Sequence, residues 1–186
     1  DKEVAKKGWL EFASDDLKAD KNFVIEAVSM WGEALEFAAN KLKDDKDVIL
    51  AAVQERLGSG EALKFASERL RKDKDLALVA VNHKYNAYEN VDETLKHDKE
   101  LILAVVKQTG WMLREVPKKL QNDRDIVLAA VEQDGAALEY ASEKLKADKD
   151  IVLTAVLSRV DALEFASDEL QSDQALKYLK RGYWDD

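Results

Sequence analysis

The apolar positions of this chain recur with a period of about 25 residues, and each repeat holds two short helical patterns. The first pattern, such as the one from Asp45 to about Gln54, is apolar on nearly every side. A helix without a polar stripe is typically buried on both flanks. The second pattern, such as the one from Gly60 to Arg71, places alanines and leucines on one face and charges elsewhere. We therefore expect an inner first helix and an outer second helix in each repeat.

Each repeat opens with an aspartate. The opening residues are Asp20, Asp45, Asp73, Asp98, Asp123, Asp148 and Asp173. They lie 25 residues apart, except for the step from Asp45 to Asp73, which is 28 residues. The three additional residues lie near Leu57-Gly58-Ser59, at the turn between the two helices of that repeat.

Helices of about ten residues are marginal in isolation, because helix nucleation is costly and few hydrogen bonds follow it. They persist when neighbouring repeats stack and share a core, so we predict an all-α fold, an α-solenoid of stacked helical hairpins. A valine column supports the stacking, and it consists of Val28, Val53, Val81, Val106, Val131 and Val156. A leucine column does the same, with Leu17, Leu42, Leu70, Leu95, Leu120, Leu145 and Leu170.

We predict one array over residues 1–186. Its parts are a partial repeat at 1–19, repeats at 20–44, 45–72, 73–97, 98–122, 123–147 and 148–172, and a capping helix with a tail at 173–186. Terminal repeats must cover apolar surface, so Tyr183 and Trp184 are expected to fold back on the last repeat.

The sequence resembles a family of short helical-hairpin repeats of unknown function that is found mainly in bacteria and protists. The resemblance is carried by the pattern Asp-Lys-Asp-Ile-Val-Leu-Ala-Ala-Val, then Gly-x-Ala-Leu-x-x-Ala-Ser-x-x-Leu-Lys, which is clearest from Asp123 to Lys146. It extends over almost the whole chain and implies a helical fold. It implies no chemistry, because the family has no established activity.

Composition narrows the class of protein. The 186 residues contain no cysteine, which removes disulfides, thiolate catalysis and cysteine-based zinc sites. The formal net charge of −9 argues against nucleic acid as the default partner. The apolar runs are far shorter than the roughly 18 residues of a membrane span, and no signal peptide is visible. We expect a monomer, cytoplasmic by default, that has no membrane contact.

No candidate motif indicates a metal, a cofactor or a catalytic centre. The Asp-x-Asp pairs, such as Asp123 with Asp125, are followed by apolar residues, whereas a calcium loop needs further oxygen ligands. The recurring serines are Ser14, Ser67, Ser142 and Ser167, and they are explained by a close helix contact that requires a small side chain. The two histidines, His83 and His97, have no ligand partner at metal-binding spacing.

The repeats from 73 to 122 depart most from the pattern. Tyr85 replaces the turn glycine and Tyr88 replaces a leucine, while Trp111 follows Gly110 and Pro117 replaces the serine. Because proline bends or shortens a helix, these changes indicate a local bend or groove. The alternative explanation is sequence drift, which a scaffold of redundant repeats tolerates, and both explanations stay open.

The three residues before each turn vary while the core columns repeat, so they are expected to line a ridge that faces a partner. Exposed turn residues also vary where nothing constrains them, and the sequence does not separate the two explanations. The residues predicted to bind a partner are Trp31, His83, Lys84, Tyr85, Tyr88, Gln108, Trp111, Gln133 and Arg159.

Three functions fit these observations. The leading hypothesis is a non-enzymatic scaffold that binds a protein or peptide. The second is an acidic decoy that imitates nucleic acid and occupies a basic protein, and steep salt dependence would distinguish it. The third is an enzyme with a site in the irregular stretch 83–114, which lacks a nucleophile paired with a base.

The opening aspartates suit the N-cap position, where a carboxylate accepts a hydrogen bond from an otherwise unsatisfied backbone N–H. We predict that Asp123→Ala lowers the free energy of unfolding by about 1 kcal/mol and uncouples neighbouring repeats. Thermal or denaturant unfolding measures the change, and an unchanged melting curve would refute the capping assignment.

Overall fold

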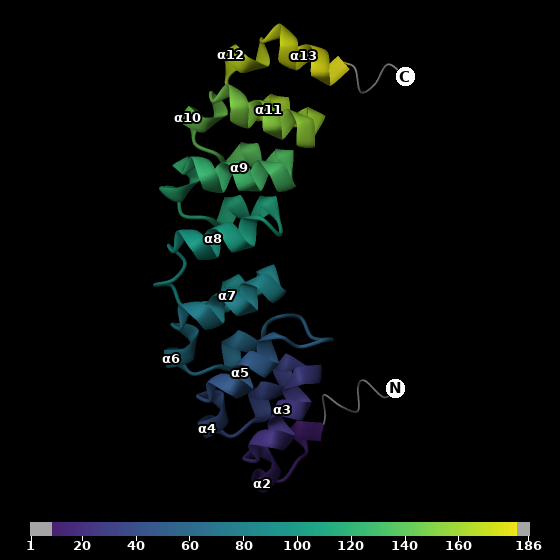
Figure 1. Ribbon diagram of the computed structural model, residues 1–186, viewed down its shortest axis with the longest axis vertical. Helices are drawn as coiled ribbons and strands as arrows, with labels where there is room; N and C mark the ends of the chain where they lie inside the picture. Colours follow the sequence, from purple (N-terminus) through teal and green to yellow (C-terminus); the bar gives the residue numbers. More distant parts are fainter. Residues whose placement is uncertain (1–8, 182–186) are drawn as a thin grey trace. The chain divides into compact units, whose positions relative to one another are not determined.

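The computed structural model describes residues 9–181, and the regular secondary structure in this range is entirely helical, with no strand (Figure 1). The all-α prediction is therefore confirmed. The chain divides into two compact halves, an N-terminal half, Asp1–Lys96, and a C-terminal half, His97–Asp186, and each is described by itself. A single array that continues through both halves stays a prediction. The predicted fold of Tyr183 and Trp184 lies outside the described residues.

The N-terminal half alternates α-helices with 3₁₀-helices. Its elements are α2 (Asp15–Lys18), α3 (Lys21–Met30), η1 (Gly32–Phe37), α4 (Asn40–Lys43), α5 (Lys46–Val53), η2 (Ala62–Phe65), α6 (Glu68–Arg71), α7 (Lys74–His83) and η3 (Tyr85–Asn90).

The C-terminal half has the same alternation. Its elements are α8 (Lys99–Val106), η4 (Gly110–Glu115), η5 (Leu120–Asn122), α9 (Arg124–Gln133), η6 (Gly135–Tyr140), α10 (Glu143–Lys146), α11 (Lys149–Ser158), η7 (Val160–Phe165), α12 (Asp168–Gln171) and α13 (Gln174–Arg181).

Each half has two layers. One layer contains the first helices of successive repeats, where α5 packs between α3 and α7, and α9 packs between α8 and α11. The other contains the 3₁₀-helices, with η2 between η1 and η3 and η6 between η4 and η7. The valine column lies fully in the core, at most 3% exposed. The leucine column is less completely buried, because Leu17 is exposed and Leu95 and Leu120 are half-buried.

The first helices are not enclosed on both flanks, and that expectation is wrong. In α5, Val48, Ile49 and Val53 are buried, but Leu50 and Ala51 on the remaining face are half-buried. The apolar run overestimates burial because a half-exposed leucine or alanine costs little in a short helix whose other face is packed.

The second helix of each repeat is not continuous, contrary to the prediction for Gly60 to Arg71. The backbone becomes extended at Ala66 and Ser67, between η2 and α6. At this break the Ser67 N–H donates to the carbonyl of Lys43 in the preceding repeat, at 2.9 Å. Ser142 and Ser167 donate in the same way to Gln121 and Lys146. At the break, one N–H of each of these repeats binds the preceding repeat.

The recurring serines are N-caps, a role that was not predicted for them, and the close helix contact stays a prediction. Ser14, Ser67, Ser142 and Ser167 each accept a hydrogen bond from the leucine N–H three residues later. Pro117 occupies the same column and lies between η4 and η5, where the helix is already interrupted. The proline therefore lies outside these helices, and a local bend or groove in the repeats from 73 to 122 stays a prediction.

The opening aspartates are N-caps, as predicted, and every one of the seven accepts a backbone N–H from the first turn that follows. The lysine or arginine after the aspartate has a second role. Lys21 bridges Asp45 and Asp47 of the next repeat at 2.8 and 2.7 Å. Lys46 pairs with Asp73, Lys99 with Asp123, Arg124 with Asp148, and Lys149 with Asp173. We call this series the Lys–Asp ladder.

The turn glycines allow the repeats to approach closely. A Cβ atom on Gly110 or Gly135 would overlap the backbone carbonyl oxygen of Ala130 or Ala155, in the first helix of the next repeat. The packing of successive repeats therefore requires glycine at 110 and 135, whereas other repeats carry Tyr85 or Val160 at the equivalent position.

The ladder predicts acid sensitivity. The hydrogen bonds from Lys21, Lys46 and Lys149 lower the pKa of Asp45, Asp73 and Asp173, respectively, below that of a free aspartate. A carboxyl whose pKa is lower in the folded state contributes stability that is full above its unfolded pKa and is lost as the pH falls through its folded pKa. The free energy of unfolding should therefore fall as the pH drops below about 4.

Denaturant unfolding between neutral and acidic pH measures this loss. Lys46→Gln should lose less stability on acidification than the unsubstituted chain, because Asp73 then has a more ordinary pKa. Lys144→Gln, an exposed lysine outside the ladder, serves as the control. Equal acid dependence in the Lys46 variant and the unsubstituted chain would contradict the role of the ladder.

Candidate binding groove

The 28-residue repeat is built around a buried carboxylate. α5 ends at Val53, and the chain continues as a loop through Glu55 to Gly60. The side chain of Glu55 has no exposed surface, and its two oxygens accept the backbone N–H groups of Gly32 and Gly60. The Lys84 ammonium lies 3.2 Å from the same carboxylate. A buried charge is tolerated when it is paired and hydrogen-bonded, as it is here.

The hydrogen bond to Gly32 has equivalents in the C-terminal half. The amide oxygen of Gln133 accepts the Gly110 N–H, and the hydroxyl oxygen of Ser158 accepts the Gly135 N–H at 3.2 Å. In each case a residue just before a turn binds the turn glycine of the preceding repeat. This column of the predicted ridge therefore carries contacts between repeats.

Two glycines give the loop its shape. Gly60 has φ +86°, in the left-handed region that glycine adopts without steric cost. A Cβ atom on Gly58 would overlap the carboxylate of Glu55. The loop can therefore close over Glu55 because both positions lack a side chain.

The outer side of this loop forms one wall of an open groove with an empty volume of about 880 Å³, part of it open to solvent. We call it the Trp31 groove. Trp31, Glu33 and Glu36 line it from η1 and the residue before it, and Leu57, Gly58 and Ser59 line it from the loop. Glu61, Lys64 and Phe65 complete it from η2 and the residue before it. The loop is fixed to η1 by the Ser59 N–H, which donates to Glu33 Oε1 at 2.8 Å.

The groove combines apolar surface with negative charge. Leu57 is 39% exposed, and Trp31 and Phe65 are half-buried. Three carboxylates, those of Glu33, Glu36 and Glu61, face one ammonium, that of Lys64, which gives a net charge of −2. The pKa of Lys64 is raised by its hydrogen bond to Glu61, and the charges of Glu33 and Glu36 raise it further. The groove therefore has a negative potential that stabilises a cation.

The Trp31 indole lies between the groove and the core. Its Nε1 atom is buried and has no hydrogen-bond acceptor among the described residues. A buried indole N–H usually has an acceptor, so this donor is unsatisfied within a residue that lines the groove.

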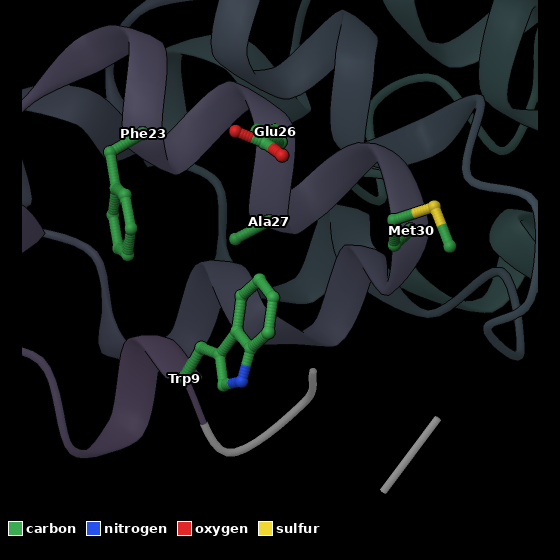
Figure 2. A pocket seen from close by; sticks show the side chains of 5 residues that line it. All are labelled: Trp9, Phe23, Glu26, Ala27 and Met30. Atoms are coloured by element: carbon green, nitrogen blue, oxygen red, sulfur yellow. The ribbon is translucent and has the colours of Figure 1, made fainter. Parts of the chain in front are cut away.

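A second pocket lies at the start of the described chain. Its lining residues are Trp9, Phe23, Glu26, Ala27 and Met30, and Figure 2 shows the Trp9 ring directed toward Ala27 on α3. Phe23 and Ala27 occupy the positions that Val48 and Ala52 occupy in the next repeat, where both are fully buried against the preceding repeat. The pocket is therefore the stacking face of the first full repeat, with Trp9 covering part of it.

The structure places the predicted partner-binding residues of the N-terminal half in different roles. Trp31 lines the groove. His83 is exposed, with Nε2 2.8 Å from the Glu55 carbonyl oxygen, and Lys84 pairs with the Glu55 carboxylate. Tyr85 is exposed, but Tyr88 is 5% exposed, and its hydroxyl donates to the Lys96 carbonyl at 3.2 Å. Tyr88 is a core residue, so the prediction that it faces a partner is wrong.

The four predicted residues of the C-terminal half are exposed. The Arg114 guanidinium lies over the Trp111 ring, 5.5 Å from its centroid. Arg159 pairs with Asp161 at 2.8 Å and lies 3.7 Å from Asp134. Gln108 donates to the Ala104 carbonyl at 3.4 Å, and Gln133 binds Gly110. These side chains are at the surface, yet each interacts within its own half.

Most residues of the groove were not predicted from the sequence. The 28-residue step did locate the turn at Leu57-Gly58-Ser59, but it was interpreted as a length change and not as a wall of a site. The glutamates at 33, 36 and 61 resemble the many other carboxylates of the chain. Their convergence depends on how η1 packs beside η2, which the sequence pattern does not specify.

Within residues 9–181, no three His, Asp or Glu side chains are grouped so that they could hold a metal ion. In the same range, no helix is both long and apolar enough to cross a membrane.

The chain belongs to the family described as Domain of unknown function (DUF4116). The family model matches in tandem, at residues 2–43, 20–57, 45–96, 98–146 and 127–171. The tandem matches confirm a repeat family of unknown function. No curated protein and no solved structure matches the chain.

Glu55 provides a test of the loop. Glu55→Ala should lower the free energy of unfolding by about 3–5 kcal/mol, because it leaves a half-buried ammonium and two backbone N–H groups without their acceptor. Chemical denaturation measures the loss. Gln54→Ala, at the exposed neighbouring position, should have little effect. Equal stability of the two variants would contradict the described role of Glu55.

Proposed function

We propose that this protein is a non-enzymatic repeat protein that binds a protein or peptide, and that the Trp31 groove is a contact surface. The observation that carries the proposal is an open groove, lined by an exposed leucine, two half-buried aromatic rings and a net negative charge, at the one repeat that has 28 residues. Recognition sites combine an apolar anchor with a few placed polar groups, and the groove has both.

An extended segment is the form of partner that suits this groove. The groove is open to solvent and is formed by short elements from two repeats, η1 and η2, together with the loop. An extended peptide can place one side chain against Leu57 and Phe65 while its backbone stays in solvent. The protein is proposed to act as a monomer, with no nucleic acid and no membrane as partner.

The acidic decoy is less well supported by the charges. A decoy needs carboxylates at phosphate-like spacing that are free to meet a basic protein. The opening aspartates that serve as acceptors in the Lys–Asp ladder are already paired with lysine or arginine. Binding at a single groove should also depend only moderately on salt, whereas a decoy should lose affinity steeply.

The enzyme hypothesis is not part of the proposal. Residues 83–114 divide between the two halves at Lys96 and His97. In the N-terminal part, the His83 ring is bound to the Glu55 carbonyl and Lys84 to the Glu55 carboxylate. These contacts are those of groups that hold a loop in place.

Peptide display on the whole chain tests the proposal. Selected peptides should bind Leu57→Ser at least about fivefold more weakly, because the variant removes an exposed apolar anchor from the groove. Trp111→Ser is the matched control, since Trp111 and Leu57 are equally exposed, at 39%, and lie in different halves. Failure to enrich any peptide, or weakening by Trp111→Ser but not by Leu57→Ser, would reject the groove as the binding surface.

A further inference from the structure

We propose that the Trp31 groove recognises a basic side chain, lysine or arginine, on an extended segment of its partner, and that this side chain takes the place of Lys64. The inference rests on the proposed function and specifies the chemistry of the partner. It follows from the charge of the groove, from the position of Lys64 and from the unpartnered indole of Trp31.

Lys64 shows where a cation is stabilised. Its ammonium lies 5.0 Å from the centroid of the Phe65 ring and pairs with Glu61. The lysine side chain is 39% exposed, so it can leave this position without opening the core. An ammonium or guanidinium from a partner would find the same ring face and the same carboxylates.

The negative charge of the groove exceeds what Lys64 neutralises. When Lys64 is bound, Glu33 and Glu36 still contribute charge to the groove, and both help to keep Lys64 protonated. When Lys64 leaves, the charges of three carboxylates act on an incoming cation, although the Glu33 carboxylate itself stays bound to Ser59. The groove therefore favours a basic partner both before and after the exchange.

Lysine at this position is unusual within the chain. The equivalent residues in four other repeats are glutamates, namely Glu36, Glu89, Glu139 and Glu164. The remaining repeat has Arg114, whose guanidinium also lies over an aromatic ring, that of Trp111. In both exceptions the cation is held on an aromatic ring of its own half. A ring in the groove is therefore a surface on which a cation is stable.

The Trp31 indole gives the site a second polar contact. Its buried N–H has no acceptor among the described residues and lies in a residue that lines the groove. If the indole turns to expose this N–H, one backbone carbonyl of an otherwise solvated extended segment could accept it while the basic side chain reaches the Phe65 ring. The site then binds both the backbone and the charge of the partner.

Nuclear magnetic resonance on the whole chain tests this inference with blocked pentapeptides. The probes are Ala-Ala-Lys-Ala-Ala and Ala-Ala-Arg-Ala-Ala, with norleucine and citrulline versions as neutral controls. The basic peptides should shift the Trp31 indole N–H and the amides of Gly58 and Ser59, and the neutral peptides should bind at least about threefold more weakly.

Variants of the protein complete the test. Lys64→Gln removes the internal competitor, so the variant should bind the lysine peptide about two- to fivefold more tightly. Glu36→Gln should bind the same peptide more weakly by a similar factor. Lys41→Gln, an exposed lysine outside the groove, should leave the affinity unchanged.

The outcomes separate the two proposals. Equal affinity of the basic and neutral peptides at the groove would overturn the cation inference and leave the groove as a peptide site. Unchanged or weaker binding to Lys64→Gln would also overturn the exchange with Lys64. If no pentapeptide shifts the groove resonances at millimolar concentration, and display selects no peptide that depends on Leu57, both proposals fail.

Discussion

Contact between neighbouring repeats is the constraint on which the structure of each half depends. Helices of ten residues or fewer cannot hold themselves together, so each repeat directs polar groups toward its neighbour as well as apolar side chains. A backbone N–H freed at the Ser67 break, a carboxylate or amide before the turn, and a lysine after the opening aspartate all bind an adjacent repeat. These contacts fix the register of the stack, which hydrophobic burial alone does not do.

The features that could be predicted from the sequence are those that depend on residues close in the chain. The caps at Asp45 and Asp123 were predicted because a cap needs only an acceptor two or three residues before a donor. The valine column was predicted because its members repeat in register. The interruption at Ser67 was not, because an N–H that donates to the preceding repeat leaves no mark on the helical periodicity of its own segment.

The candidate site shows the same division. Trp31 was predicted because the residues before each turn vary, and the turn at Leu57 was located by the 28-residue step. The glutamates at 33, 36 and 61 were not singled out. Lys84 and Gln133 were predicted to face a partner because they vary, but they hold neighbouring repeats together. Variation in a repeat protein can reflect different solutions to one packing problem, such as a buried glutamate in one repeat and a glutamine or serine in others. The Trp31 groove arises where that solution needed a longer loop.

The Lys–Asp ladder has a direction, since each cation reaches forward to the aspartate that opens the next repeat. Any stretch of 25 residues that carries both groups offers one acceptor at its start and one donor for its successor. Whole repeats can therefore be gained or lost by duplication or deletion of the coding sequence while both junctions remain complete. Insertion or deletion of a few residues inside a helix would instead move its buried positions out of register with the neighbouring repeats. Length changes are thus tolerated mainly at the turn, and this protein carries its three additional residues there.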